Sequence, residues 1–251
     1  MNRIVLLAVM TAIILLPIKG YALGKYAFKF VLYYPQVPPY MYQMDQQPEV
    51  RGVIAALMNE FFRQQHIKLN YVIDNRNRAE HRLYSGDVDA IMLAKNWTEH
   101  PEQLIFSEPV LVHRDFLFAT TPFADYSNPA DWLNKVRICT RQYYKYEALE
   151  PFFAKGSVRI DSSSEAAQMR MLASGRCDYA YMNEHVAAWL HQHQFAELKL
   201  YRSPSSFGTV GLTIALNPRW QHLLPKLNQF INQQRESGSI ESMLAKEIQA
   251  R

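Results

Sequence analysis

Apolar residues recur along the chain in two alternating patterns, one typical of strands and the other of helices. Residues 28–34 alternate and are rich in β-forming side chains, which predicts a strand. Between residues 53 and 62 the apolar positions fall at helical spacing, which predicts an amphipathic helix. Residues 68–73 predict a second strand, and the apolar run 88–94 predicts a strand of the buried, parallel kind. The first part of the chain therefore has an α/β pattern.

The same order of elements returns later in the chain. Residues 136–140 and 178–182 predict two strands, with a helix between them that starts at a capping sequence at residues 162–165. Residues 83–90 and 172–179 share the pattern Leu-x-Ser-Gly-x-x-Asp at a helix-to-strand junction. A common turn sequence would also give this similarity. Because the flanking elements agree in order as well, we favour two similar α/β lobes.

The last part of the chain returns from the second lobe to the first. Residues 208–215 predict a strand that could cross back between the lobes. Two helices then follow, because apolar residues recur at helical spacing. These residues are Leu223, Leu227, Phe230 and Ile231 in the first helix, and Ile240, Met243 and Leu244 in the second.

The first 22 residues have the pattern of a secretory signal peptide. Arg3 precedes an apolar run over residues 4–16, and small residues follow, so we expect cleavage after Ala22. An uncleaved membrane anchor is the alternative, but the run is shorter than the roughly 20 residues that span a bilayer. We therefore expect export to the periplasm and a soluble mature chain.

Charge and cysteine content narrow the partners further. The chain has 27 basic and 23 acidic residues, and removal of Arg3 and Lys19 with the signal leaves a net charge of +2. This near balance disfavours binding to nucleic acid or to an anionic membrane. Cys139 and Cys177 would enter an oxidising compartment, where a disulfide is permitted, although placement on two parallel strands argues against one. Both alternatives stay open. The spacing matches no metal site, and we expect no cofactor.

A series of short motifs, in a consistent order, covers nearly the whole mature chain. They are Pro38-Pro39-Tyr40, Gly52, and residues 85–90, 98–99, 106–109, 174–178 and 208–212. With them the chain resembles the family 3 extracellular solute-binding proteins, the receptors of polar amino acid ABC transporters, as a divergent member.

The resemblance implies a fold, a site and partners. The fold is the α/β two-lobed periplasmic-binding-protein fold of type II, with ligand bound in a cleft that closes by a hinge motion. Lobe 1 would comprise residues 23–118 and 211–251, and lobe 2 residues 119–210. The expected partners are a small solute and an ABC permease or a sensor ectodomain, and the expected state is a monomer.

The chain departs from the family at two positions that recognise amino acids. Members that bind α-amino acids carry an arginine for the α-carboxylate shortly after a Thr-x-Glu motif, but residues 98–103 contain none. The acidic residue that holds the α-ammonium group is replaced by Asn183, with Glu184 beside it. These losses argue against an ordinary free α-amino acid, although an arginine elsewhere could bind the carboxylate.

The resemblance and the strand ends together select candidate ligand-binding residues. The loop at residues 141–144 is bulky, aromatic and cationic where the family has glycine and serine, which indicates a ligand with a flat or anionic part. Surface or core packing is the alternative for each candidate. The candidates are Tyr34, Tyr40, Arg76, Arg78, Asn96, Trp97, Arg141, Tyr143, Tyr144, Asn183 and Glu184.

Three functions are compatible with this sequence. We favour a non-catalytic binding protein for uptake or sensing, because the chain has no nucleophile elbow, zinc-protease motif or phosphate loop. An enzyme on the same fold, such as a cyclohexadienyl-type dehydratase with Glu184 as its carboxylate, is the alternative. A receptor without a dedicated transporter is the third.

Overall fold

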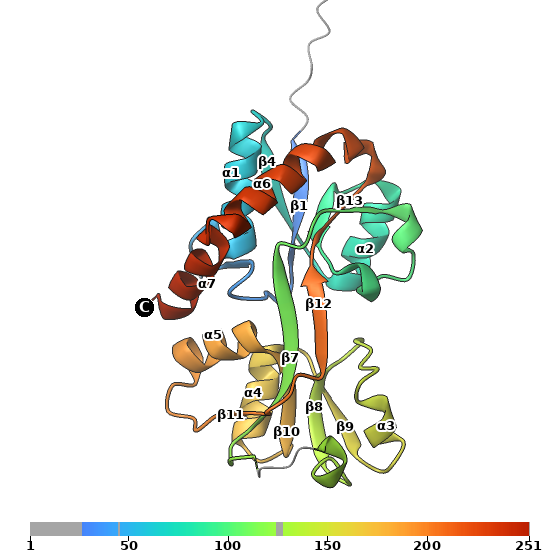
Figure 1. The fold of residues 1–251 in the computed structure, drawn as a ribbon, viewed down its shortest axis with the longest axis vertical. Helices are drawn as coiled ribbons and strands as arrows, with labels where there is room; N and C mark the ends of the chain where they lie inside the picture. The colour runs from blue at the N-terminus through green and yellow to red at the C-terminus, as the bar shows by residue number, and fades with distance from the viewer. Residues whose placement is uncertain (1–26, 45, 124–127, 251) are drawn as a thin grey trace, which may run out of the picture.

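Two β-sheets, at opposite ends of the molecule, organise the chain (Figure 1). The structure is a computed structural model that describes residues 27–44, 46–123 and 128–250. The predicted signal peptide, residues 1–22, lies outside the described residues. Among those that are described, no helix combines the length and apolar character needed to cross a membrane.

The first sheet has five strands in the order β4-β1-β5-β13-β6. Strand β1 runs parallel to β4 and β5, whereas β13 runs antiparallel to β5 and β6. The mixed directions follow from the topology, because β13 enters the sheet from the second lobe. The strands are β1 (Phe28–Tyr33), β4 (Leu69–Asp74), β5 (Ala90–Met92), β6 (Ile105–Phe106) and β13 (Ile214–Leu216).

Helices cover this first sheet. Helix α1 buries the apolar stripe that the sequence predicts, and α2 begins at the capping side chain of Asn75 and ends at Gly86 in the left-handed conformation. The helices are α1 (Val53–Gln64), α2 (Arg76–Ser85), α6 (Leu224–Glu236) and α7 (Ser239–Gln249). A small hairpin pairs β2 (Tyr42–Gln43) with β3 (Val50–Arg51). Short 3-10 helices lie at Lys95–Trp97, Pro101–Gln103, Pro129–Asp131 and Pro218–Leu223.

Gly52 joins the proline-rich loop to the start of α1. The N–H groups of Val53 and Ile54 donate to the carbonyls of Pro39 and Tyr40, each at 3.0 Å. Gly52 has φ of 105°, and a Cβ there would lie 2.4 Å from the Tyr40 carbonyl oxygen. Only glycine fits this approach, and the contact fixes the position of Tyr40.

The second sheet follows the order β11-β7-β10-β8-β9, with β12 also paired to β7. Strand β8 runs parallel to β9 and β10, whereas β7 is antiparallel to β10, β11 and β12. The strands are β7 (Leu111–Ala119), β8 (Arg137–Arg141), β9 (Val158–Ser162), β10 (Tyr179–Asn183), β11 (Tyr201–Arg202) and β12 (Gly208–Leu212).

Three helices belong to the second lobe: α3 (Glu150–Phe153), α4 (Glu165–Ala173) and α5 (Glu184–Gln194). The predicted cap of α4 is present, since the Ser164 hydroxyl accepts from the Ala167 N–H at 3.1 Å. Gln168 ties α4 to the sheet. Its buried amide donates to the carbonyls of Cys139 and Tyr181, at 2.9 and 2.7 Å.

Two short segments connect the sheets, and they lie side by side (Figure 1). Residues 107–110 lead from β6 to β7, and Thr213 separates β12 from β13. The expected lobe limits stay a prediction. Because β7 pairs within the second sheet from Leu111 onward, we propose that the lobes meet at residues 107–110 and Thr213.

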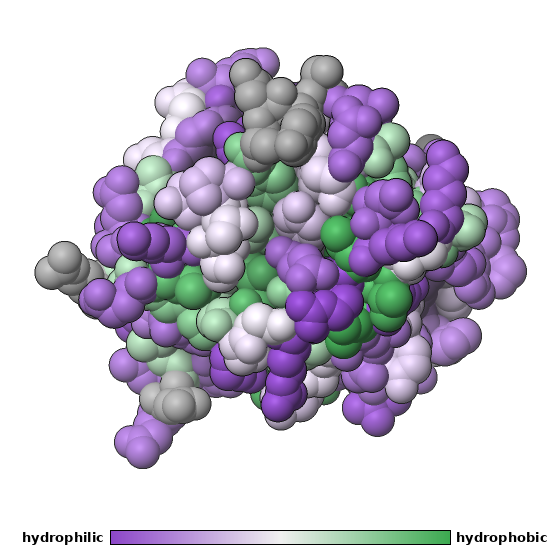
Figure 2. Space-filling model, turned by 90° about the horizontal axis from the view of Figure 1, so that it is seen from below, coloured by the Kyte–Doolittle hydropathy of each residue, from purple (hydrophilic) through white to green (hydrophobic). Residues whose placement is uncertain are grey.

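Within the part of the chain that the structure describes, buried apolar residues form two clusters. The larger continues from the first lobe, with Phe28 and Leu57, into the helical side of the second lobe, with Met169 and Trp189. The smaller lies elsewhere in the second lobe and includes Tyr146. Seen from below, the molecule has small apolar areas scattered between hydrophilic side chains (Figure 2). The face in that view has no broad apolar surface.

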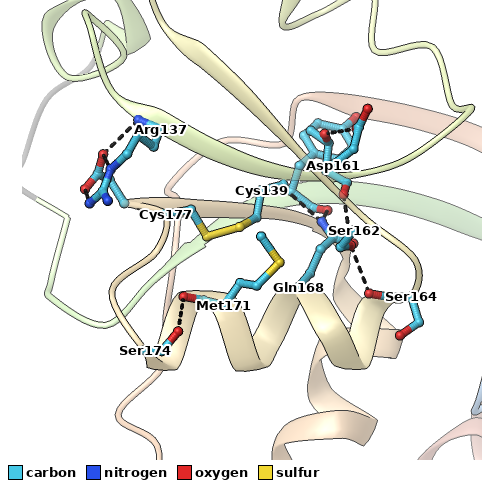
Figure 3. Close-up of a disulfide and its surroundings, with 12 residues drawn as sticks. Arg137, Cys139, Asp161, Ser162, Ser164, Gln168, Met171, Ser174 and Cys177 are labelled. Carbon is cyan, nitrogen blue, oxygen red and sulfur yellow. Dashed lines mark hydrogen bonds and ion pairs between the residues drawn. A yellow bond between two sulfur atoms is a disulfide. The ribbon is translucent and has the colours of Figure 1, made fainter.

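Cys139 and Cys177 form a disulfide (Figure 3). The argument against it assumed that Cys139 ends one strand and that Cys177 begins another, parallel one. Strand β10 instead begins at Tyr179 and pairs with β8 at Ile138, so Cys177 lies in the turn before it. That turn faces β8, and the two Cα atoms are 5.7 Å apart.

Replacing both cysteines by alanine is expected to lower the free energy of unfolding by roughly 2–4 kcal/mol, because the unfolded chain regains the freedom of the loop between them. Urea denaturation measures the change. Dithiothreitol should shift the midpoint of the native protein toward that of the double variant and leave the double variant unaffected. A double variant as stable as the native protein would contradict a stabilising role.

Candidate functional site

Tyr40, in the first lobe, contacts the second lobe through its hydroxyl. The side chain is fully buried, and the hydroxyl donates to Oδ1 of Asn183 at 2.8 Å and lies 3.0 Å from Nδ1 of His185. Burial, together with the carboxylates of Asp115 and Glu184, raises the pKa of Tyr40 well above its usual value. The hydroxyl therefore stays protonated and remains a donor.

Asn183 is the residue at which β10 passes into α5. Besides the Tyr40 hydroxyl, its Oδ1 accepts the N–H groups of His185 and Val186, at 2.9 and 3.2 Å, and so caps the helix. Its Nδ2 donates to the Arg114 carbonyl at 3.0 Å. The amide is thus held in one orientation by groups on β7, α5 and the first lobe.

Trp97 and His113 form a second contact between the lobes. Trp97 ends a 3-10 helix after β5, and His113 lies on β7, where the two rings meet edge to face with centres 4.8 Å apart. Nε2 of His113 is 3.1 Å from Oδ1 of Asp115. This contact lies next to the first, because the Tyr40 ring is 6.1 Å from the His113 ring.

Arg76 approaches the second lobe from the start of α2. Its guanidinium donates to the Trp97 carbonyl at 2.9 Å and lies 3.5 Å from the carboxylate of Glu80. The guanidinium carbon is 5.9 Å from the centre of the Tyr144 ring, which belongs to the loop after β8. A cation thus faces an aromatic ring across the boundary between the lobes.

Arg141, the last residue of β8, lies near the same ring. Its guanidinium carbon is 5.3 Å from the centre of the Tyr144 ring, and Nη1 forms an ion pair with Glu165. Burial alone would lower the pKa of Arg141, but Glu165 and the tyrosines nearby raise it, so the group stays charged. Tyr144 therefore has a guanidinium from each lobe within cation–π distance.

The structure brings together six of the predicted residues: Tyr40, Arg76, Trp97, Arg141, Tyr144 and Asn183. Of the other five, Glu184 lies beside the contact, close enough to act on Tyr40 and His185, and the remaining four lie elsewhere. The role of all five in binding stays a prediction. Tyr34 and Tyr143 are 67% and 80% exposed, Asn96 is exposed, and Arg78 pairs with Asp74 in its own lobe. Glu184 accepts from Arg114 at 2.6 Å and from Arg202 at 2.9 Å, within the second lobe.

Four residues at the contact were missed in the sequence: Glu80, His113, Glu165 and His185. His185 lies two positions after Asn183, so the start of a helix was the signal that could have identified it. Glu80 is four residues after Arg76, the spacing of an ion pair on a helix. The sequence has no comparable signal for His113, whose position depends on the crossing of β7.

Two surface hollows formed by described residues lie on the first lobe near Gln43 and Pro48, with volumes of about 440 and 560 Å³. Neither hollow includes a residue of the contact between the lobes. We therefore regard the lobe boundary, and not these hollows, as the candidate site.

The family comparison gives a direct result. Residues 30–250 match the family of bacterial extracellular solute-binding proteins, family 3, and the chain belongs to this family. The resemblance seen in the sequence is thereby confirmed. A sequence comparison with curated proteins finds no significant match.

Solved structures share the two-lobed fold at low sequence identity. A protein from Wolinella succinogenes, described as a binding component of an ABC transporter and complexed with lysine, has a TM-score of 0.75 and 16% identity, over 88% of this chain and 95% of that one. A histidine kinase sensor domain has a TM-score of 0.71 and 19% identity, over 88% of this chain and 96% of that one. AncCDT-1 is an ancestral amino acid-binding protein and a precursor of cyclohexadienyl dehydratase. It has a TM-score of 0.70 and 16% identity, over 88% of this chain and 95% of that one. The predicted fold class is confirmed.

Replacing Tyr40 by phenylalanine is expected to favour separation of the lobes, because it removes their shared hydrogen bond, worth about 0.5–1.5 kcal/mol. Solution X-ray scattering should give a larger radius of gyration for the solute-free variant. Tyr71→Phe is the control, since the Tyr71 hydroxyl donates to Asn59 at 3.0 Å within the first lobe. The same radius of gyration in both variants would argue against the contact.

Lowering the pH should reduce the free energy of unfolding through the protonation of His185. Burial, the largest effect, lowers the pKa of His185, and His113 and Arg114 act in the same direction against Glu184. Below about pH 6.5, His185 therefore takes up a proton more readily in the unfolded chain than in the folded one. This difference lowers the free energy of unfolding as the pH falls.

Between pH 7.5 and pH 5, the free energy of unfolding measured by urea denaturation should accordingly fall less in His185→Gln than in the native protein. His222→Gln is the control, because His222 is exposed. An equal loss in all three proteins would show that His185 titrates in its ordinary range.

Proposed function

We propose that this protein is a periplasmic solute-binding protein that captures a small polar solute by closure of its two lobes. The solute is amino-acid-like or an organic or aromatic acid. The observation that supports the proposal is the meeting of polar and aromatic side chains from both lobes, Tyr40 with Asn183 and Arg76 with Tyr144, beside a two-segment connection. Such a connection allows hinge closure.

The contact between the lobes is suited to opening and closing. Its interactions include the two hydrogen-bond contacts of the Tyr40 hydroxyl, a cation over a ring and a pair of aromatic rings. Interactions of these kinds contribute about 1 kcal/mol each, so water or a solute can replace them at little cost. A polar solute that bonds to both lobes would favour the closed form.

Uptake and sensing are the two uses of such a protein. Similar structures include a binding component of an ABC transporter and a sensor domain of a histidine kinase. The predicted signal peptide supports export, and we propose that a monomer delivers the solute to an ABC permease or a sensor ectodomain.

A dehydratase is the second candidate, because one similar structure is a precursor of cyclohexadienyl dehydratase. Glu184 was the expected catalytic carboxylate. Both of its carboxylate oxygens accept from guanidinium groups, those of Arg114 and Arg202, within the second lobe. Because these bonds hold both oxygens, we propose binding without catalysis.

A thermal-shift screen of the mature protein against amino acids, peptides, organic acids and aromatic acids tests the proposal. A specific solute should raise the unfolding temperature in a concentration-dependent way. At one hundred times its Kd, it should add about 2.7 kcal/mol to the free energy of unfolding. Tyr144→Ala should lose the shift, whereas Tyr201→Ala, on an edge strand of the second lobe, should keep it.

Two results would contradict the proposal. One is the absence of a shift with every class of solute. The other is turnover of a cyclohexadienyl acid that is abolished in Glu184→Gln, which would establish the enzyme instead.

A further inference from the structure

We infer that the solute is a small dicarboxylic acid, one carboxylate of which binds the guanidinium of Arg76 while the other binds that of Arg141. The acid needs no α-ammonium group. This inference rests on the proposed function, since it names the class of solute for the same site. It follows from the hydrogen-bonding capacity that the side chains at the lobe boundary leave unused.

Buried donors without partners are concentrated at this boundary. Among the described residues, five buried side-chain atoms have no hydrogen-bond partner, and none is a carboxylate oxygen. They are Arg76 Nε, His113 Nδ1, Arg141 Nε, Gln168 Oε1 and Trp189 Nε1. Arg76 Nε, Arg141 Nε and Trp189 Nε1 always carry hydrogen, whereas His113 Nδ1 is a donor in only some protonation states. Trp189 packs against Tyr42, so the two arginine atoms are the obligatory donors near Tyr144 that lack acceptors, which a carboxylate would provide.

Each guanidinium is already positioned by a carboxylate of the protein. Arg76 uses Nη2 towards Glu80, and Arg141 uses Nη1 towards Glu165, which leaves both Nε atoms free. Glu80 is itself held by the Tyr84 hydroxyl, at 2.5 Å. Because a guanidinium can bind a carboxylate through two N–H groups, an oriented Arg with a free Nε is suited to a second, incoming carboxylate.

The acceptors around Asn183 have no comparable spare capacity for an ammonium group. Oδ1 of Asn183 already accepts three donors, and both oxygens of Glu184 accept from arginines. Oδ1 of Asp115 lies 3.1 Å from Nε2 of His113, and Oδ2 lies 3.4 Å from the Tyr181 hydroxyl. The acceptors around Asn183 are therefore engaged, and the spare acceptor at the boundary is Oε1 of Glu165, whose Oε2 pairs with Arg141.

The number of carboxylates follows from the position of the two arginines. Arg76 belongs to the first lobe and Arg141 to the second, and both lie near the single ring of Tyr144, at 5.9 and 5.3 Å. Their guanidinium carbons are therefore no farther apart than the sum of these distances. A short acid with a carboxylate at each end can bind both, so its binding would couple the lobes.

Isothermal titration of the mature protein with succinate, glutarate, butyrate and L-lysine tests the inference. We expect succinate or glutarate to bind, and butyrate and L-lysine to bind at least tenfold more weakly. Arg76→Lys and Arg141→Lys keep the charge but lose the planar pair of N–H groups that binds a carboxylate. Each should weaken dicarboxylate binding at least tenfold. Arg170→Lys, an exposed position on α4, is the matched control and should bind like the native protein.

The possible outcomes separate this inference from the proposed function. Tight binding of L-lysine or another amino acid without binding of dicarboxylates overturns the inference and leaves the proposed function standing. Equal binding of butyrate and succinate overturns the role of the second guanidinium. If the arginine variants do not fold, the preference of the native protein among the four probes still decides. If none of these probes binds, the inference fails, and a negative wider screen would overturn the proposed function as well.

Discussion

The pair of segments that connects the two sheets is the constraint on which the rest of the structure depends. Residues 107–110 and Thr213 run side by side, and the N–H groups of Ser107 and Val110 donate to the carbonyls of Ile214 and Leu212, at 2.9 and 2.8 Å. A Cβ at Gly211 would lie 2.8 Å from the ring of Pro109, so only glycine permits this approach. The connection is therefore a narrow ribbon, and rotation about it leaves both sheets intact.

The two sides of this ribbon differ in chemistry. On one side α7 lies against α5 (Figure 1), and the rings of Tyr42 and Trp189, both part of the apolar cluster that extends through the two lobes, are 5.4 Å apart. On the other side Arg76 faces Tyr144. Separation of the apolar side would expose nonpolar surface, at about 25 cal/mol per Å², whereas polar groups regain hydrogen bonds from water. The lobes should therefore open on the polar side, where the candidate site lies.

The sequence predicted elements better than it predicted side-chain positions. Periodicity located β1 and α1 closely, because their burial follows from local spacing. Tyr40 and Asn183 were identified because strand ends and a tight loop limit where such residues can lie. Tyr143 was grouped with Tyr144, but it has a positive φ of 67° and points away into solvent, which no spacing reveals. The disulfide depended on where the strand after Cys177 begins, and the boundaries of elements are the least reliable part of a prediction from sequence.

The distance between the two lobes, measured in single molecules by energy transfer between a dye on α2 and a dye on α3, tests the account most directly. We predict two interconverting distances in the solute-free mature protein, and a shift to the shorter one when a stabilising solute is added. A single distance that stays the same when such a solute binds would contradict closure of the lobes as the basis of function.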